Sequence, residues 1–280
     1  MDRIAYVNGE YVPESRAGVS IFDRGFLFAD AAYEVTAVIG ARLIDFPAHA
    51  RRLSYSLGEL RIDRPASEPE LLSIHRALVE RNGVEEGSVY IQVSRGAADR
   101  SFFYPDIAES TVIAFTQEKR IVDHPAVARG VHVTLTDDLR WGRRDIKTVQ
   151  LLYSSMARTY AAEAGYDDAW LTQDGVITEA TSSNAFIVTE GRLVTHPLDR
   201  HILPGITRSA VIELAVHAGL GVEERAFTVD EARRADEAFM TSSTTVVLPV
   251  VKIDDLPVGD GVPGPVTREL RRRYFERLSE

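Results

Sequence analysis

Three glycine-containing turns, each between two short β-prone segments, constrain the fold of this chain most strongly. The dipeptides are Asn8-Gly9, Asp174-Gly175 and Glu190-Gly191. Asn-Gly and Asp-Gly suit the tight turns that join antiparallel strands, because the central residues of such turns need a positive φ. A β-prone run from Ala32 to Phe46, turning near Gly40, predicts a further hairpin. Antiparallel β-structure is therefore expected in both halves of the chain.

Helical patterns are interleaved with these hairpins. Leu53, Leu57 and Leu60 recur at the spacing of one helix face. Ser67, with Glu70 three residues later, forms a capping box, which marks the start of a second helix. Further helices are predicted over residues 149–164, 207–218 and 267–278. This mixture predicts the α+β class, with each domain a β-sheet with flanking helices.

The 280-residue chain is long enough for two domains of ordinary size. The stretch Glu118 to Gly130 is polar, contains His124-Pro125, and is the best candidate for a linker. We therefore predict a small N-terminal α+β domain over residues 1–121, a linker over 122–126 and a larger C-terminal α+β domain over 127–280.

Charge and composition exclude several classes of protein. The formal net charge of −10 argues against general nucleic-acid binding, which needs a cationic surface. The chain has no cysteine, so disulfides and thiolate metal sites are impossible, and no metal site is predicted. The first residues lack the apolar segment of a secretory signal, and no apolar run approaches membrane-spanning length. A cytoplasmic protein without nucleic-acid or membrane partners is expected.

Two polar clusters have the chemistry of anion sites. The segment from Leu203 to Arg208 is a Pro-Gly turn that leads into a helix, whose start offers N–H donors and the hydroxyl of Thr207. The ordinary alternative is that Thr207 is only an N-cap. Residues 241–245 carry five consecutive hydroxyls, which either hold a phosphate or form a solvated turn.

Three other clusters carry groups used in catalysis. Lys147 lies just before an apolar helix and is one of three lysines in the chain, with Lys119 and Lys252. A lysine can form a Schiff base with a carbonyl cofactor, although most lysines are solvated surface residues. Residues 178–184 place Glu179 among several hydroxyl side chains. This polar segment between two strands is either a functional site or an ordinary turn at the edge of a sheet. Asp23-Arg24-Gly25, followed by aromatic residues, forms either a polar site or part of the core.

Six segments, in chain order, resemble the fold-type IV pyridoxal-phosphate-dependent enzymes, a group that includes D-amino-acid and branched-chain transaminases and aminodeoxychorismate lyase. They are FDRGFLFADAAYEV, HARRL, DIKTVQLL, EATSSNAF, LPGITR and TSSTTVVLPV. The segments YIQVSRG and DDLRWGRRDIK are most similar to the D-amino-acid transaminases. The resemblance extends over almost the whole chain, so it predicts a two-domain fold-type IV enzyme.

The resemblance implies a role for each matching residue. Lys147 is expected to hold pyridoxal 5′-phosphate as a Schiff base, and Glu179, with Arg140 nearby, to pair with the ring nitrogen. Leu203 would support the face of the ring. The expected phosphate ligands are Arg52, the backbone at Ile206, and the hydroxyls of Thr207, Ser243 and Thr244, where the family usually has threonine at the position of Ser243.

The substrate residues implied by the resemblance are Tyr33, Arg100 and Ser182. Arg100 would reach the pocket of a partner subunit, so a homodimer is expected. The family has a histidine where this chain has Phe102, which removes one charged donor. We predict ping-pong transamination between a D-amino acid and a 2-oxo acid. The alternatives are a branched-chain or amine transaminase, an aminodeoxychorismate lyase, and a non-catalytic cofactor-binding protein.

Overall fold

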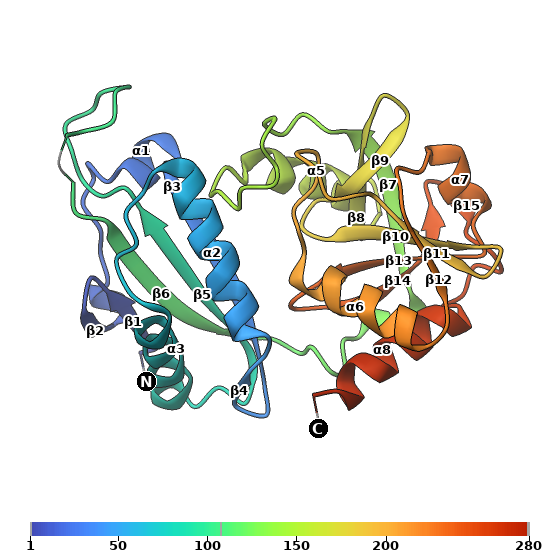
Figure 1. Cartoon of the computed structure of the whole chain (residues 1–280), viewed down its shortest axis with the longest axis horizontal. Helices are drawn as coiled ribbons and strands as arrows, with labels where there is room; N and C mark the ends of the chain where they lie inside the picture. The colour runs from blue at the N-terminus through green and yellow to red at the C-terminus, as the bar shows by residue number, and fades with distance from the viewer. Residues whose placement is uncertain (1, 107, 279–280) are drawn as a thin grey trace. The chain divides into compact units, whose positions relative to one another are not determined.

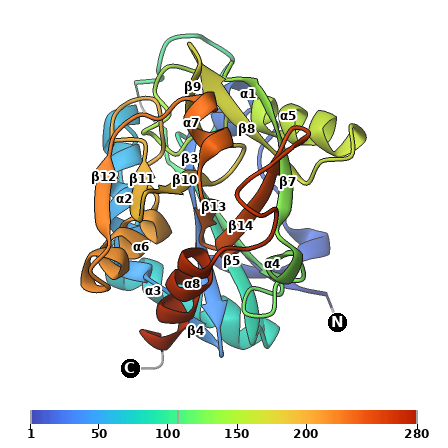
Figure 2. The ribbon, with the colours of Figure 1, turned by 90° about the vertical axis from the view of Figure 1, so that its right-hand side faces the viewer.

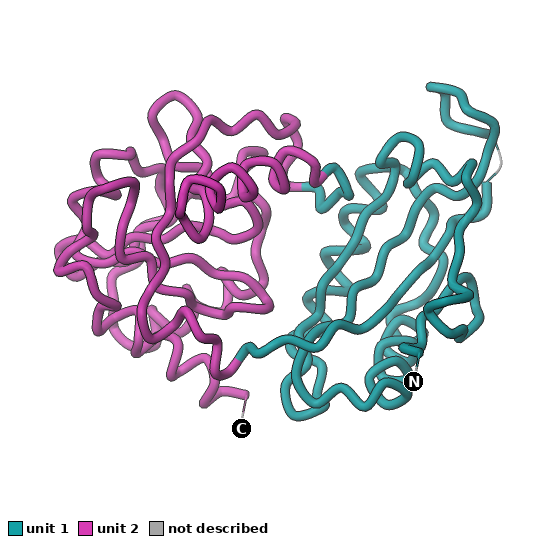
Figure 3. The backbone as a smooth tube through the Cα atoms, turned by 180° about the vertical axis from the view of Figure 1, so that it is seen from behind, with its two compact units in different colours: residues 1–121, 146–150 teal, residues 122–145, 151–280 magenta. Residues whose placement is uncertain are grey.

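The computed structural model describes residues 2–106 and 108–278. The chain divides into two compact units, which are coloured separately in Figure 3. Unit 1 comprises Met1–Ile121 and Ile146–Gln150, and unit 2 comprises Val122–Asp145 and Leu151–Glu280. The sequence interpretation has a linker at 122–126 and assigns all later residues to one domain. In the structure the helix α4 (Ala126–Arg129) begins within that linker, and residues 146–150 belong to unit 1.

Unit 1 is an antiparallel sheet with two helices against one face (Figure 1). The strand order is β2-β1-β6-β5-β3-β4. The strands are β1 (Ile4–Val7), β2 (Glu10–Pro13), β3 (Ala31–Ile39), β4 (Arg42–Leu43), β5 (Glu86–Ser94) and β6 (Thr111–Glu118). The helices are η1 (Glu14–Arg16), α1 (Arg24–Phe28), α2 (Phe46–Leu60) and α3 (Glu68–Asn82). Helices α2 and α3 cover the sheet.

The local signals for unit 1 are confirmed. Asn8 and Gly9 have φ of 46° and 98°, as the tight turn between β1 and β2 requires. The capping box of Ser67 and Glu70 begins α3, and the left-handed Gly83 ends it. The hairpin predicted from Ala32 to Phe46 is shorter than expected, because Phe46 already begins α2.

Unit 2 is a mixed sheet with five helices among the described residues. The strand order is β12-β11-β10-β13-β14-β7-β8-β9, and β15 pairs with β14. The strands are β7 (Val131–Asp137), β8 (Asp168–Gln173), β9 (Val176–Ala180), β10 (Asn184–Thr189), β11 (Arg192–Thr195), β12 (Gly221–Glu224), β13 (Glu237–Ser242), β14 (Val246–Ile253) and β15 (Leu256–Pro257). The helices are α4, α5 (Leu152–Glu163), α6 (Ile206–His217), α7 (Val229–Arg234) and α8 (Pro265–Glu276). Helix α8 packs against β13, β14 and α6 (Figure 2).

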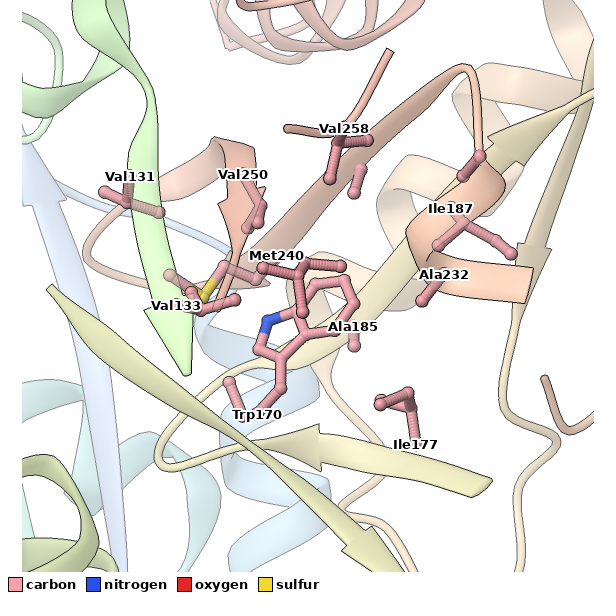
Figure 4. Close-up of a cluster of buried hydrophobic side chains, with 14 of the residues drawn as sticks. Val131, Val133, Trp170, Ile177, Ala185, Ile187, Ala232, Met240, Val250 and Val258 are labelled. Carbon is pink, nitrogen blue, oxygen red and sulfur yellow. The ribbon is translucent and has the colours of Figure 1, made fainter. Parts of the chain in front are cut away.

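The core of unit 2 is apolar and built from strands distant in sequence. Val133, Trp170, Met240 and Val250, which come from four different strands, meet in one cluster (Figure 4). Trp170 is 0% exposed. Full burial of a large apolar side chain stabilises a fold by on the order of 2–3 kcal/mol. This core fixes the ends of β9, β10 and β13, from which the polar groups of unit 2 project.

Helix α5 differs from the sequence prediction in both extent and orientation. It begins at Leu152, and Val149 lies in the segment assigned to unit 1. The apolar residues that predict the helix, Leu152, Met156 and Tyr160, are 75%, 39% and 60% exposed. The buried residues of α5 are Ala157 and Ala161. The apolar spacing identifies the helix correctly, but that face does not pack into the core of this chain.

Candidate active site

Lys147 lies on a short extended segment that pairs with the edge of β3 in unit 1. The Tyr33 N–H donates to the Lys147 carbonyl at 3.0 Å, and the Val149 N–H donates to the Ala31 carbonyl at 3.2 Å. The Lys147 ammonium donates to Tyr33 Oη at 3.2 Å and lies 4.3 Å from the centre of that ring. Two residues predicted for the site, 114 positions apart, are therefore in direct contact.

The ring of Tyr33 belongs to an aromatic stack across the sheet. It stacks on Tyr90 at 5.4 Å, and Tyr90 stacks on Phe115 at 4.9 Å. Burial raises the pKa of the Tyr90 hydroxyl, with a smaller contribution from Tyr33, and this hydroxyl donates to Gln92 Oε1 at 2.8 Å. Because strand residues alternate between faces, the stack lies on the face opposite α2 and α3. Tyr33 is thus held by ring packing as well as by its backbone.

Arg52 is oriented by a buried carboxylate. Its Nε and Nη2 donate to the two oxygens of Glu34 at 2.7 and 2.8 Å, and His49 Nδ1 lies 2.7 Å from Glu34 Oε2. Burial opposes ionisation of Glu34, but the charge and hydrogen bonds of Arg52, with help from His49, hold the pKa of Glu34 well below its usual range. A bidentate pair of this kind fixes the direction of the guanidinium.

Helix α2 also connects Arg52 to the segment that carries the lysine. The Lys147 N–H donates to Ser56 Oγ at 3.1 Å. Ser56 and Arg52 are one helical turn apart, so they share a face of α2. The sequence indicates Arg52, but Glu34, His49 and Ser56 were missed, although Glu34 lies within the AYEV part of the first motif.

The loop that carries Arg100 and Phe102 is fastened to α1. Arg24 Nη1 donates to the carbonyls of Ser101 and Phe103 at 2.7 and 3.3 Å, on either side of Phe102. The guanidinium of Arg100 lies over the ring of Phe28 at 5.5 Å. Among the described residues of this chain, Arg100 makes no hydrogen bond, and Phe102 is 82% exposed. The structure therefore does not bring Arg100 to Lys147 or Tyr33 within this chain.

Glu179 is the centre of a buried polar network in unit 2. Arg140 Nη1 donates to its Oε1 at 2.5 Å. Its Oε2 accepts from Asn184 Nδ2 at 3.0 Å and from the Leu203 N–H at 3.1 Å. Glu179 is 4% exposed, and its burial raises the pKa of the carboxyl while the charge of Arg140 opposes that shift. The contacts with Arg140 and Leu203 join residues that the sequence predicts for the site.

Asp138 fixes Arg140 in turn. Arg140 Nε and Nη2 donate to the two Asp138 oxygens at 2.9 and 2.6 Å, and Thr178 Oγ1 donates to Asp138 Oδ2 at 2.7 Å. Burial opposes ionisation of Asp138, but the hydrogen bonds and charge of Arg140 lower its pKa. The carboxylate of Glu179 is therefore held by an arginine that cannot easily turn away. Neither Asp138 nor Asn184 was predicted for the site, although Asn184 lies within the EATSSNAF motif.

The start of α6 has unused hydrogen-bond donors. Its N-cap is Gly205, which has no side chain, and Thr207 is the second helical residue rather than the N-cap. Thr207 is 3% exposed. In the part of the chain that the structure describes, neither its hydroxyl nor the N–H groups of Ile206 and Thr207 have an acceptor. A Cβ on Gly205 would lie 1.9 Å from Asn184 Oδ1, so glycine is required there.

The hydroxyl turn between β13 and β14 lies close to this helix start. Thr241 is paired with Asn184 across the sheet, and directly paired residues project to the same face. The buried Thr241 hydroxyl has no hydrogen-bond partner. Ser243 follows in the turn, and its hydroxyl also makes no hydrogen bond among the described residues. Thr244 lies beside it in the same turn.

The backbone of this turn is strained. Val246, at its end, has a φ of 60°, which is unfavourable for a β-branched residue. Such a conformation costs on the order of 1–3 kcal/mol and persists only where its surroundings enforce it, often at binding sites. Unit 2 therefore combines a buried carboxylate with a helix start and a strained turn that both offer hydrogen-bond donors. These groups suit a ligand that has a hydrogen-bond donor for the carboxylate and an anionic group for the donors.

Ser182 is separate from this network. It is exposed in the turn between β9 and β10 and makes no hydrogen bond among the described residues. Within those residues no group of three or more histidine, aspartate or glutamate side chains is placed to hold a metal ion. No helix of the described ranges is both long and apolar enough to span a bilayer.

Comparison with known proteins assigns the chain to a family. Residues 31–253 match the family described as amino-transferase class IV, and the chain belongs to that family. A D-alanine aminotransferase of Staphylococcus aureus (strain MW2) is 38% identical over 282 residues, covering 100% of this chain and 99% of that protein. A D-alanine aminotransferase of Bacillus licheniformis is 40% identical over 266 residues, covering 94% and 93%.

The fold is likewise that of solved class IV aminotransferases. The branched-chain amino acid aminotransferase of Thermobaculum terrenum, solved in its PLP (holo) form, superposes with a TM-score of 0.87 at 25% identity, covering 99% of this chain and 94% of that one. The family and the α+β fold predicted from the sequence motifs are therefore confirmed.

Proposed function

We propose that this chain transfers the amino group of a D-amino acid to a 2-oxo acid, using pyridoxal 5′-phosphate attached at Lys147. The observation that carries this proposal is the match to D-alanine aminotransferases over the whole chain, at 38% identity. In the first half of the reaction the D-amino acid gives up its amino group, and in the second half the 2-oxo acid receives it. D-Alanine is the first substrate to test.

The donor set of unit 2 fits the phosphate of this cofactor. A phosphate dianion needs several N–H and O–H donors, which a helix start supplies well. The N–H groups of Ile206 and Thr207 and the hydroxyls of Thr207 and Ser243 make no other hydrogen bonds among the described residues. The buried, unpartnered hydroxyl of Thr241 faces the same side of the sheet as Asn184. We assign the phosphate to these groups, together with Thr244 and Arg52.

When bound, the cofactor supplies an electron sink that stabilises negative charge at the substrate Cα. Glu179 would keep the ring nitrogen of the cofactor protonated by accepting a hydrogen bond from it. Burial raises the pKa of Glu179 in the chain alone, and a cation beside the carboxylate would lower that pKa again. Arg140, Asn184 and the Leu203 backbone keep the carboxylate in place for this task. Leu203 would also support the face of the ring.

Lys147 is the base that moves the proton. With the cofactor bound, its Nζ would take the proton from the substrate Cα and deliver it to the aldehyde-derived carbon of the cofactor, so that no proton is gained or lost. Tyr33 Oη, at 3.2 Å from Nζ, restricts where the amine can move. Arg100 is assigned to the substrate carboxylate because a guanidinium can bind a carboxylate through two hydrogen bonds. Ser182 is likewise assigned to substrate binding.

We propose that the enzyme is a homodimer in which Arg100 serves the site of the partner. Phe102 and Phe103 beside it are 82% and 85% exposed, which is unusual for large apolar side chains and favours coverage by another chain. Mixing the inactive variants Lys147→Ala and Arg100→Ala tests this arrangement. If Arg100 acts across subunits, mixed dimers contain one intact site and recover part of the activity.

Reduction with borohydride tests the covalent assignment directly. The purified protein is treated with pyridoxal 5′-phosphate and borohydride and digested, and the labelled peptide is identified by mass spectrometry. The label is expected on Lys147, and Lys119 and Lys252 are internal controls because the chain has only these three lysines. A label on Lys119 or Lys252 alone would contradict the proposal. Lys147→Ala should abolish transamination, and Lys119→Ala should not.

A branched-chain transaminase is the second candidate. The solved relative with a TM-score of 0.87 is named for branched-chain amino acids, and Phe102 places an apolar group beside Arg100. Rates with D-alanine and with L-leucine, both with 2-oxoglutarate, separate the two candidates, since faster turnover of L-leucine would reverse the assignment. An assay with aminodeoxychorismate and no oxo acid separates both candidates from an aminodeoxychorismate lyase. The lyase would release pyruvate without any amino-group acceptor.

A further inference from the structure

Arg271 of α8 reaches the strained turn from the C-terminal helix. Its Nη1 donates to the carbonyls of Thr245 and Val247 at 2.6 and 3.0 Å. These two carbonyls flank Val246, the residue with a φ of 60°. Its Nη2 donates to the Val122 carbonyl at 2.9 Å. One buried guanidinium therefore binds the backbone on both sides of the strained residue.

The helix that carries Arg271 is capped at its start by a carboxylate from β13. Glu237 accepts from the N–H groups of Val266 and Thr267, both at 2.8 Å, and so caps the start of α8 in place of Gly264. A Cβ on Gly264 would lie 1.9 Å from the Glu237 Cδ, so the cap depends on a glycine there. Arg271 is 7% exposed, and its guanidinium lies 4.9 Å from the ring of Phe275.

Burial lowers the pKa of Arg271 to about 10, so its side chain remains charged at neutral pH. A charged donor forms stronger hydrogen bonds to carbonyls than a neutral one. The conformation of Val246 needs enforcement from its surroundings, and Arg271 provides it on both sides of that residue. The backbone that Arg271 holds closes the turn that contains Ser243 and Thr244. The positions of these two hydroxyls therefore depend on Arg271.

We propose that Arg271 is a positioning residue for the cofactor phosphate: by holding the carbonyls of Thr245 and Val247, it keeps the hydroxyl turn of residues 242–245 in its binding conformation. This inference rests on the proposed function, because it requires that the turn binds the phosphate. Arg271 is not among the groups assigned to the phosphate. It acts through the backbone.

Comparing two aldehydes tests this role. Pyridoxal 5′-phosphate and pyridoxal both react with a lysine, but only the former has the phosphate that the turn would bind. In Arg271→Met, affinity for pyridoxal 5′-phosphate should fall about tenfold or more, as expected when charge-assisted hydrogen bonds are lost, while affinity for pyridoxal stays within about twofold. A general loss of structure would lower both affinities alike. An unchanged ratio of the two affinities overturns the inference.

Arg272→Met is the matched control, because Arg272 lies next to Arg271 on α8 but pairs with Glu269 and Glu276 at the surface. It should leave both affinities unchanged. Arg271→Gln keeps one short donor and covers the case in which Arg271→Met folds poorly. It should give an intermediate loss for pyridoxal 5′-phosphate only.

Val246 supplies a second, independent test. Val246→Gly removes the strain, because glycine tolerates a positive φ, whereas Val246→Ala shortens the side chain and keeps the strain. In the Val246→Gly background, Arg271→Met should cost clearly less affinity for pyridoxal 5′-phosphate than in the Val246→Ala background. Equal losses in both would overturn the link to the strained backbone. If the wild-type chain fails to bind pyridoxal 5′-phosphate at Lys147, the proposed function fails, which is a separate result.

Discussion

Asn184 determines how firmly the Glu179 carboxylate is held, and replacing it with alanine measures that contribution. Its Nδ2 donates to Glu179 Oε2 at 3.0 Å and to the Leu203 carbonyl at 2.9 Å, and the residue is 4% exposed. A hydrogen bond to a charged group contributes about 1.5–3 kcal/mol and one to a neutral carbonyl about 0.5–1.5 kcal/mol. Asn184→Ala should therefore lower the free energy of unfolding by about 2–4 kcal/mol.

Thermal unfolding followed by circular dichroism measures this loss. One kcal/mol shifts the midpoint of a domain of 150–250 residues by roughly 2–4 °C, so a fall of about 5–15 °C is expected. Ser183→Ala is the control, because the neighbouring Ser183 hydroxyl makes no hydrogen bond among the described residues. It should change the free energy of unfolding by no more than about 0.5 kcal/mol. An Asn184→Ala midpoint equal to that of Ser183→Ala would refute the reasoning.

Asn184→Asp separates charge from packing at the same position. It keeps the size of the side chain but brings a second carboxylate beside Glu179, and like charges raise the pKa of both groups. Its stability should therefore be lowest near neutral pH and should recover relative to the wild type as the pH falls and one carboxylate binds a proton. Asn184→Ala should show a smaller recovery, because it removes one hydrogen bond from the carboxylate but adds no second negative charge. Parallel pH profiles for the two variants would contradict this account.

Three further predictions follow from other residues. Glu34→Gln removes the charge that Arg52 and His49 face and should cost about 3–5 kcal/mol in urea unfolding. Because the pKa of Glu34 is lowered in the folded state, its contribution to the free energy of unfolding is present above the unfolded pKa of about 4.3 and is lost on acidification. The variant should therefore lose part of the acid sensitivity of the wild type. An equal dependence of the free energy of unfolding on pH in both proteins would count against the pairing. His75 is buried, and burial lowers its pKa to about 4, so the wild type should lose stability as pH falls from about 6.5 towards 4. His75→Phe should flatten the stability profile in that window, and a retained slope would assign it to other groups. Phe102→His adds a donor beside Arg100 and should lower KM for D-alanine about five- to tenfold with little change in kcat, a difference of about 1–1.4 kcal/mol; an unchanged KM would remove position 102 from the carboxylate pocket.

Local signals in the sequence were sufficient for most elements. The Asn8-Gly9 turn, the capping box of Ser67 and the left-handed Gly83 depend on residues a few positions apart, and the structure confirms each. The short elements α1, α4, α7, β12 and β15 were missed, because segments of two to six residues carry little periodicity. For α5 the apolar spacing revealed the helix but not its buried face.

The partners of the candidate site residues were harder to predict. Lys147, Glu179 and Arg140 were identified through motifs, since each lies in a short recognisable segment. Asn184 and Asp138 were not assigned a role, because their importance comes from hydrogen bonds to Glu179 and Arg140 rather than from their neighbours in sequence. Arg271 had no signal at all, being one arginine in a charged C-terminal helix.

The sequence by itself determined the family, the α+β class and the order of most strands and helices, because these depend on local propensity and on motifs read along the chain. Only the tertiary structure decided that residues 146–150 join unit 1, where Lys147 contacts Tyr33 across 114 positions. It likewise decided that Arg271 holds the backbone around Val246. The physical reason is that such hydrogen bonds form between groups brought together by packing of the core, and the sequence does not encode that proximity in the spacing of neighbouring residues.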